Sequence, residues 1–344
     1  MIELRSDTFT KPTKKMIEAI SVTELGDDVY GEDNTVNRLE TLSAEMLGKE
    51  AGCFMPSGTM ANLASIMAHC PRGSKVLVGD ESDIYIYEAG GAAVCGGIMY
   101  ESIPTQVDGR LLIDDLEKSL LIDKNDPQFA LPALICLENT HNRCGGIVLP
   151  LEYLKQVSEL ANKYKVPIHM DGARLFNAST YLGVKPSEIV KYADSVQFCL
   201  SKGLSAPIGS MVVGSKSFIN KVRRIRKMLG GGMRQVGVVA AAGIVSLNEM
   251  VDRIKEDHDN TLILAKGLAD IPGVEVNIDN VQTNIVFFTI NDERYTWQEF
   301  IERAQDLGLN IAELGYGRIR AVTHYGINKE DIYKALDIIS NILK

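Results

Sequence analysis

Two charged side chains follow two apolar runs of the sequence and could act on the same ligand. The run 166–169 leads to Asp171, and the run 196–199 leads to Lys202, which lies 31 residues after Asp171. That spacing is about one strand-helix-strand unit, so both side chains are expected at the carboxyl edge of one parallel sheet. Taken singly, Asp171 could be a helix cap and Lys202 a solvated lysine. As a pair on this edge, they indicate a binding site.

Ser57, Gly58 and Thr59 form a turn that could bind phosphate. The turn follows the apolar run 52–55 and opens a helix-like segment. Backbone N–H groups at a helix N-terminus attract anions. Serine and threonine also begin many helices as simple caps, so the turn alone predicts no ligand. It lacks the lysine of a P-loop and the GxGxxG spacing, and it therefore gives no support to a nucleotide site.

Pyridoxal phosphate needs all three of these features at once. Its phosphate suits a helix N-terminus, its ring nitrogen needs a carboxylate to stay protonated, and a lysine can hold its aldehyde as a Schiff base. The turn 57–59, together with Asp171 and Lys202, therefore predicts this cofactor.

The elements that must position these residues follow an alternating pattern from about residue 50 to 215. Short apolar runs alternate with amphipathic segments such as 151–165. Apolar runs of this length suit strands that are buried on both faces of a parallel sheet. The expected strands are 52–55, 75–78, 98–100, 134–137, 166–169, 196–199 and 210–213. The pattern predicts an α/β domain with right-handed crossovers.

The last quarter of the chain has a different pattern, which predicts a smaller α+β domain. A long apolar helix is expected at 236–250, before this change. Beyond residue 255, the expected strands are 274–277, 285–290 and 319–322, and the expected helices are 297–306 and 328–343. We therefore expect two domains, residues 1–254 and residues 255–344.

The composition excludes several classes of protein. The 344 residues include 36 Lys and Arg against 45 Asp and Glu, a net charge of −9, which argues against nucleic acid as a partner. The longest weakly polar stretch, 236–247, falls short of the roughly 18 residues of a membrane span. The charged residues Glu3, Arg5 and Asp7 do not fit an export signal. We expect a cytoplasmic protein that does not bind membranes.

The six cysteines and five histidines form no metal-ligand pattern. The cysteines are scattered without a CxxC pair, as in proteins of a reducing compartment. We therefore expect neither a disulfide framework nor a metal site. His169 stands shortly before Asp171 on the same run, and we expect it to point to the opposite face of the sheet.

Eight motifs, spread over nearly the whole chain, carry a family resemblance. They are LRSDTFTKPT (4–13), GDDVYGED (26–33), FMPSGTMAN (54–62), LENTHN (137–142), HMDGARLFNA (169–178), CLSKGLSAPIGS (199–210), KMLGGGMRQ (227–235) and RAVTH (320–324). In these motifs the sequence closely resembles the L-threonine aldolases, pyridoxal-phosphate enzymes of the aspartate aminotransferase fold, also called fold type I. The resemblance implies an α/β fold with a large, mostly parallel-sheet domain and a small α+β C-terminal domain.

The resemblance also implies roles around the cofactor. Lys202 would hold it as a Schiff base, Asp171 would bind the ring nitrogen, and Arg174 would lie beside the ring. The turn 57–59 would bind the phosphate.

Further roles concern the substrate and a second subunit. Ser6 and Arg320 would bind the carboxylate of an amino-acid substrate, a bidentate task that suits arginine. Without the family, Arg320 would be interpreted as a strand residue facing solvent. In this family the loop with Lys227 and Arg234 reaches a neighbouring subunit's site, which implies a homo-oligomer, either a dimer or a tetramer.

The sequence departs from the family at two positions. Asp83 stands where the family usually carries a histidine that covers the cofactor ring and contacts the substrate hydroxyl, and a second family histidine falls at about Gln128. With both imidazoles absent, another group must take the hydroxyl proton. The candidates are a water held by Asp83, or a phenol, Tyr85 or Tyr87. Asp83 is therefore a candidate catalytic residue and Gln128 a candidate substrate-binding residue.

Together these observations predict a lyase that cleaves the Cα–Cβ bond of L-threonine or L-allo-threonine, giving glycine and acetaldehyde. Two alternatives remain. One is a related β-eliminating lyase that uses the same cofactor. The other is a catalytically impaired cofactor-binding scaffold, against which the presence of Lys202, Asp171 and Arg320 argues.

Overall fold

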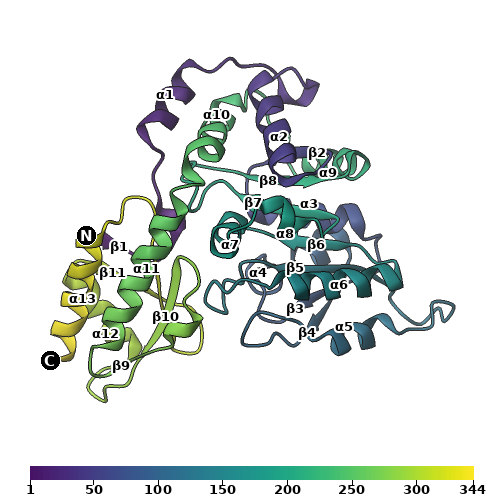
Figure 1. Cartoon of the computed structure of the whole chain (residues 1–344). Coiled ribbons are helices and arrows are strands. Elements are labelled where there is room, and N and C mark those ends of the chain that lie inside the picture. Colours follow the sequence, from purple (N-terminus) through teal and green to yellow (C-terminus); the bar gives the residue numbers. More distant parts are fainter.

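The computed structural model describes residues 1–344 and contains a central seven-stranded sheet (Figure 1). The strands lie in the order β2-β8-β7-β6-β5-β3-β4. Their bounds are β2 (Ala51–Met55), β3 (Lys75–Gly79), β4 (Met99–Ile103), β5 (Pro132–Glu138), β6 (Ile168–Asp171), β7 (Ser195–Cys199) and β8 (Ser210–Gly214). Every strand expected in this region is present, and the ends differ from the prediction by at most three residues.

One strand of this sheet, β8, runs against the others. The pairs β3–β4, β3–β5, β5–β6 and β6–β7 are parallel, whereas β8 is antiparallel to both β7 and β2. Residues 200–209, which join β7 to β8, are fewer than the dozen or so that a parallel crossover requires, so the chain reverses. The parallel neighbours β6 and β7 bring their carboxyl ends to one edge, where Asp171 is paired with Gln197.

Helices cover both faces of this sheet. On one face, a core of 41 buried residues includes side chains of α1 (Lys14–Val22), α2 (Asn34–Leu47), α5 (Ile113–Leu120), α6 (Leu151–Tyr164), α7 (Leu175–Leu182), α8 (Pro186–Val190) and α10 (Gly237–Val245). The helices α3 (Gly58–His69), α4 (Asp83–Ile86) and α9 (Lys216–Met228) belong to two smaller clusters with other residues of the strands. The predicted α/β arrangement is confirmed.

The C-terminal part contains a four-stranded antiparallel sheet in the order β12-β13-β10-β9. Its strands are β9 (Val274–Val276), β10 (Ile285–Ile290), β12 (Ala312–Glu313) and β13 (Ile319–Val322). Together with α11 (Ile254–Ala269), α12 (Trp297–Asp306) and α13 (Lys329–Leu343), they bury a second core of 20 residues. The helix expected at 236–250 is α10, continued by one π-helical turn, Ser246–Met250.

The N-terminal segment connects the C-terminal part with the large sheet. Strand β1 (Ile2–Glu3) pairs in parallel with β11 (Leu309–Asn310), and Ile2 and Leu4 belong to the second core. The chain then forms a short 3-10 helix, Asp7–Phe9, in which the side chain of Asp7 is fully buried. Because β1 holds the segment in place, residues 5–10 lie between the two sheets (Figure 1).

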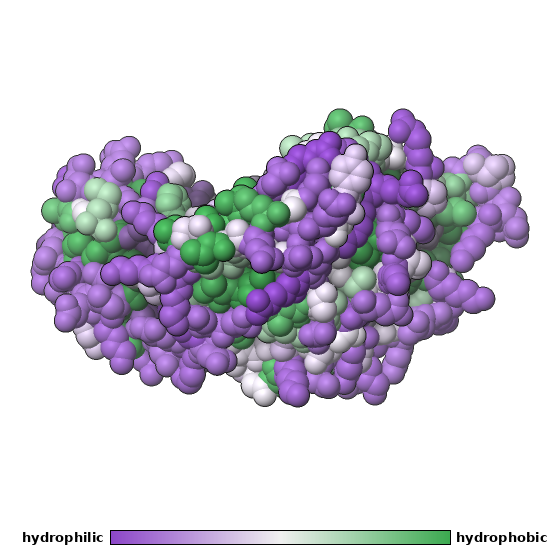
Figure 2. Space-filling model, turned by 90° about the horizontal axis from the view of Figure 1, so that it is seen from above, coloured by the Kyte–Doolittle hydropathy of each residue, from purple (hydrophilic) through white to green (hydrophobic).

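Apolar side chains are exposed around α1 and α10. They include Ile17, Val22, Leu25, Val29 and Val238. Figure 2, viewed from the side on which these helices lie, shows hydrophobic surface gathered near the middle of this face. None of the helices combines the length and the hydrophobicity needed to cross a membrane.

Candidate active site

A cavity of about 280 Å³ lies at the carboxyl ends of β6 and β7. Several separate segments of the chain contribute to its wall. Among its lining residues are Ser57, Gly58, Thr59, Asp83, Tyr87, Asp171 and Lys202. The structure therefore brings together the turn, the carboxylate and the lysine that the sequence suggested for one cofactor.

The turn 57–59 begins α3 at the edge of this cavity. Ser57 caps the helix, because its Oγ accepts a hydrogen bond from the backbone N of Met60 at 3.1 Å. The first backbone N–H groups of a helix have no partner within it, so they are free to bind an anion. A Cβ on Gly58 would lie 3.0 Å from Cys199 Sγ, which leaves little room for any side chain there.

Asp171 ends β6 and is surrounded by hydrogen-bond donors. Its Oδ2 accepts from Asn62 Nδ2 at 2.8 Å, and its Oδ1 accepts from Gln197 Nε2 at 2.5 Å and from the backbone N of Ala173 at 3.0 Å. Burial raises the pKa of Asp171, while Lys202 and the side-chain donors act to lower it. Three donors hold the carboxylate in one orientation, as a partner of a ring nitrogen requires.

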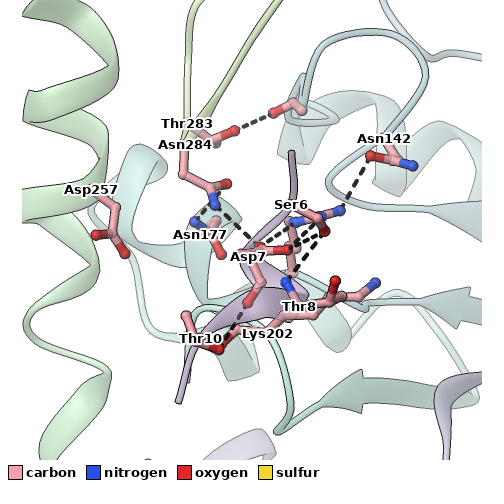
Figure 3. Close-up of polar contacts among 12 residues, drawn as sticks. Ser6, Asp7, Thr8, Thr10, Asn142, Asn177, Lys202, Asp257, Thr283 and Asn284 are labelled. Carbon is pink, nitrogen blue, oxygen red and sulfur yellow. Dashed lines mark hydrogen bonds and ion pairs between the residues drawn. The ribbon is translucent and has the colours of Figure 1, made fainter. Parts of the chain in front are cut away.

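Lys202 lies in the loop after β7, and its side chain reaches the cavity wall. The hydroxyl of Thr10 donates to its backbone oxygen at 2.9 Å (Figure 3). The same hydroxyl also bonds to the backbone oxygen of Asp7, at 2.8 Å. The N-terminal segment thus fixes the loop that carries the lysine.

Two arginines lie together beside this segment. Arg174 and Arg320 both donate to Asn142 Oδ1, at 3.3 and 2.8 Å. Arg320 is buried, contrary to the solvent-facing interpretation, and its Nε has no partner. Burial, together with the neighbouring Arg174, lowers the pKa of Arg320 to about 10. A buried guanidinium with a free donor is suited to bind a carboxylate.

Asp7 provides one negative charge between these arginines and the small sheet. Arg174 binds it through two nitrogens, each at 2.7 Å, and Asn284 Nδ2 donates to it at 3.1 Å (Figure 3). Although burial opposes its charge, Arg174 holds the pKa of Asp7 well below its usual range. Ser6 is the preceding residue, and its Oγ accepts from the backbone N of Thr8 at 3.3 Å.

Asp83, which stands in place of the family histidine, begins α4 and lines the cavity. Asn142 Nδ2 donates to its Oδ1 at 3.1 Å. The carboxyl of Glu138 accepts from the backbone N of both Asp83 and Asn142, each at 2.7 Å. Burial and then Asp83 raise the pKa of Glu138 well above its usual range. Asn142 therefore links Asp83 to the two arginines.

Of the two candidate phenols, only Tyr87 lines the cavity. Its hydroxyl accepts a hydrogen bond from Arg143 NH1 at 2.8 Å. Tyr85 instead packs edge-on against Tyr100, with ring centres 6.0 Å apart. The geometry therefore favours Tyr87 over Tyr85 as a group that could meet a ligand.

Ser6, Arg174 and Arg320 are not among the residues that line this cavity, although both arginines reach its wall through Asn142, which binds Asp83. Three further candidates lie farther from it in their own chain. Lys227 lines a separate cavity of about 410 Å³, and Arg234 forms an ion pair with Asp27 at 2.9 Å. Gln128 is exposed in the loop between α5 and β5, where its backbone N donates to Asp126 at 2.9 Å. Their roles at a site remain predictions.

The prediction for His169 is wrong, because residues two apart on a strand point to the same side. His169 Nε2 lies 3.1 Å from Asn62 Oδ1, and Asn62 also binds Asp171. Both ring nitrogens of His169 have side-chain partners, since Nδ1 lies 2.9 Å from Ser195 Oγ.

Sequence reasoning assigned no role to several residues that shape the site: Asp7, Asn62, Glu88, Glu138, Asn142 and Gln197. Two of them had a usable signal. Gln197 is an amide within an otherwise buried apolar strand, and Asn62 follows Thr59 by three residues, which is one helical turn. The others depend on contacts between distant segments.

The family of the protein follows from comparison with known sequences. Residues 3–291 match the beta-eliminating lyase family, and the chain belongs to it. A probable low-specificity L-threonine aldolase 2 of Arabidopsis thaliana is 46% identical over 343 residues, which cover 99% of this chain and 97% of the relative. A low specificity L-threonine aldolase of Escherichia coli is 42% identical over 332 residues, 96% of each chain. The predicted resemblance to threonine aldolases is confirmed.

Solved structures support the fold class. A threonine aldolase of Leishmania major has a TM-score of 0.85 at 16% identity and covers 100% of both chains. A serine palmitoyltransferase of Sphingomonas wittichii has a TM-score of 0.76 at 17% identity, covering 98% of this chain and 86% of that chain. The chain has the α/β architecture of the fold type I enzymes, as predicted.

Proposed function

We propose that the protein is a pyridoxal-phosphate-dependent lyase. It would cleave the Cα–Cβ bond of L-threonine, L-allo-threonine and related β-hydroxy-α-amino acids to glycine and an aldehyde. The observation that carries this proposal is the single cavity that joins Lys202, Asp171 and the helix N-terminus at 57–59. The relatives at 42–46% identity, named as low-specificity L-threonine aldolases, support the substrate class.

The residues of the cavity fit the cofactor. The N-terminus of α3 would bind its phosphate, Lys202 its aldehyde carbon, and Asp171 its ring nitrogen. Arg174 does not line the cavity, but Asn142 links it to Asp83 in the cavity wall. When bound, the cofactor supplies an electron sink for the carbanion that bond cleavage leaves. Asp171 contributes by keeping a negative charge at the ring nitrogen, since three donors stabilise its ionised form.

The substrate carboxylate would bind at Arg320. Its unpartnered Nε and its neighbour Arg174 provide positive charge that Asp7 only partly balances. Ser6, next to Asp7, would add a hydroxyl donor. Held there, the amino acid would place its β-hydroxyl within the same cavity as Asp83 and Tyr87.

A base must take the proton of the β-hydroxyl. Tyr87 is the phenol that we favour, because it lines the cavity and Arg143 NH1, which donates to its oxygen at 2.8 Å, holds it in place. The alternative is a water held by Asp83, whose carboxylate Asn142 orients. Either group would serve where the family uses histidine.

The active unit would be a homo-oligomer, a dimer or a tetramer, working in the cytoplasm. Lys227 and Arg234 would then reach the cavity of a neighbouring subunit, and Gln128, at the position of the second family histidine, would contact the substrate. The exposed apolar side chains of α1 and α10 support association of subunits, and six free cysteines support a reducing compartment.

The decisive experiment is an assay of the purified protein against L-threonine, L-allo-threonine and phenylserine. We expect glycine and the matching aldehyde from each active substrate. Formation of a 2-oxo acid and ammonia would instead indicate a β-eliminating lyase. Two observations favour that alternative: Asp83 replaces the family histidine, and the matching family is named for β-eliminating lyases. Bound cofactor without turnover of any substrate would favour a scaffold.

Reduction with borohydride tests the cofactor site. It should attach the cofactor permanently to the peptide that contains Lys202. Labelling of any other lysine would contradict the assignment.

A further inference from the structure

A chain of buried polar groups extends from Asp171 to the far end of α3. Asn62 binds Asp171, and His169 Nε2 lies 3.1 Å from Asn62 Oδ1. Ser195 Oγ then lies 2.9 Å from His169 Nδ1 and 2.8 Å from His69 Nε2. The three inner members, Asn62, His169 and Ser195, are at most 1% exposed. Beyond Asn62, no member of this chain has a role in the proposed function.

The chemistry of the partners fixes the direction of every hydrogen bond. Both N–H groups of Asn62 face carboxyls, since its Nδ2 lies 2.8 Å from Asp171 and 2.7 Å from Glu88. Its Oδ1 can only accept, so His169 must carry its proton on Nε2. With one proton on its ring, His169 accepts at Nδ1.

The remaining two bonds follow from that tautomer. Ser195 must donate to His169 Nδ1, and its oxygen then accepts from His69 Nε2. Burial lowers the pKa of His169 to about 3 and that of His69 to about 4, so both rings are neutral at neutral pH. All donors therefore point toward Asp171.

We propose that His169, oriented by Ser195 and His69, is a positioning residue that fixes the amide of Asn62 and thereby keeps Asp171 ionised and aligned. Aligned hydrogen bonds polarise one another, so the chain strengthens the donor that meets the carboxylate. The proposal rests on the proposed function in one respect: Asp171 is taken to face a cofactor ring.

The first test uses the protein without cofactor. Nitrogen NMR of protein labelled in histidine should show His169 with its proton on Nε2 across the neutral pH range. Ser195→Ala should shift the Nδ1 signal, because the donor to that atom is removed. A proton on Nδ1 in the parent protein would reverse the chain and overturn the proposal. This result does not depend on whether the protein is an aldolase.

The second test uses protein loaded with pyridoxal phosphate and a matched pair of variants. Ser195 and Ser65 are both fully buried, but Ser65 Oγ donates only to the backbone oxygen of Ala61, at 2.7 Å. We expect Ser195→Ala to weaken cofactor binding about tenfold, at the lower end of what loss of an outer hydrogen-bond partner costs at metal sites. Ser65→Ala should leave binding within about twofold, and Ser195→Thr, which keeps the hydroxyl, should restore it.

A spectroscopic readout separates positioning from a structural role. With a less stabilised Asp171, the ring nitrogen is less protonated and withdraws less charge from the nitrogen of Lys202. The pH midpoint of the visible absorbance should therefore rise by roughly half a unit in Ser195→Ala. The charged and titratable groups that face Asp171 and Lys202 are unchanged in this variant: Asp7, Asp83, Glu88, Glu138, Arg174 and Cys199.

The outcomes are distinct. If Ser195→Ala and Ser65→Ala lower the melting temperature alike and share one absorbance titration, the chain is only structural and the proposal fails. If neither the parent protein nor any variant binds the cofactor, the proposed function fails, but the NMR result still tests the direction of the hydrogen bonds.

Discussion

At Arg320 a buried guanidinium has a free Nε and a second arginine beside it. We expect Arg320→Ala to lower kcat/KM for L-threonine by roughly thirty-fold to several thousand-fold, because a charge-assisted pair lost from a buried site costs about 2 to 5 kcal/mol. Steady-state kinetics on both threonine diastereomers would measure it. Arg320→Lys should recover only part of the loss, since lysine cannot bind a carboxylate in the bidentate manner. Unchanged kinetics in Arg320→Ala would remove this residue from the substrate site.

Tyr87 and Tyr85 allow a matched test of which phenol replaces the missing histidine as the base. Tyr87→Phe removes the only phenol in the cavity, so we expect cleavage of L-threonine to fall by roughly a hundred-fold or more, the usual value of general-base assistance. Tyr85→Phe should stay close to the parent, because Tyr85 packs against Tyr100 instead. The two variants are compared by kcat in the same assay. Equal activities would direct the search for the base to Asp83.

Glu88 shares the neutral amide of Asn62 with Asp171 and accepts from no charged donor. Burial, followed by Asp171, raises the pKa of Glu88 well above its ordinary value of 4.5. Above that ordinary value, the folded protein holds a proton that the unfolded chain releases, so the free energy of unfolding falls as pH rises toward the folded pKa.

The variant Glu88→Gln cannot lose a proton and keeps the shape of the neutral acid. Its free energy of unfolding should therefore fall less than that of the parent as the pH rises above the ordinary pKa of a glutamate. Urea denaturation of the cofactor-free proteins at several pH values measures the difference. Parallel curves for the two proteins would mean that Glu88 is already ionised in the folded state.

At the scale of elements, the sequence predicted the strands well because they are buried on both faces and leave long apolar runs. It could not predict β1, β11 and β12, which have two residues each and exist only through pairing with distant segments. The reversal at β8 follows from the length of the connection 200–209, which is too short for a parallel crossover. The local sequence pattern thus predicts the long strands, whereas the two-residue strands depend on pairing between distant segments.

The N-terminus of α3 leaves little room for a larger side chain. A Cβ at Gly58 would lie 3.0 Å from Cys199 Sγ on the neighbouring strand β7. We expect Gly58→Ala to lower stability by about 1 to 3 kcal/mol, the usual cost of overpacking, and to weaken cofactor binding by moving the phosphate turn. Thermal unfolding and a cofactor titration would test both effects. Gly91→Ala, at a position with helical φ, is the control, because the nearest atom there is a Leu63 methyl at 3.4 Å.

At the scale of the whole molecule, the spacing of Asp171 and Lys202 was enough to predict a shared sheet edge. The residues that hold them were harder to predict. Asp7 reaches the site because β1 pairs with β11, and Asn142 lies between Asp83 and Arg320 only in the folded chain. These contacts join the N-terminal segment, the large sheet and the small sheet. Because the contacting residues are far apart in the chain, no local sequence pattern predicts them.

The placement of Lys227 and Arg234 outside their own chain's cavity makes an intersubunit site testable. If these residues complete a partner's site, Lys202→Ala and Lys227→Ala should each be inactive alone. A hybrid of the two would have one intact site, formed by the unchanged cavity of one chain and the unchanged loop of the other. Random mixing of dimers should then restore roughly a quarter of the parent activity. Mixing Lys202→Ala with Asp171→Ala should restore none, because both changes lie in the same cavity. Activity that stays absent in the first mixture, with subunit exchange verified by mass spectrometry, would show that each chain works alone.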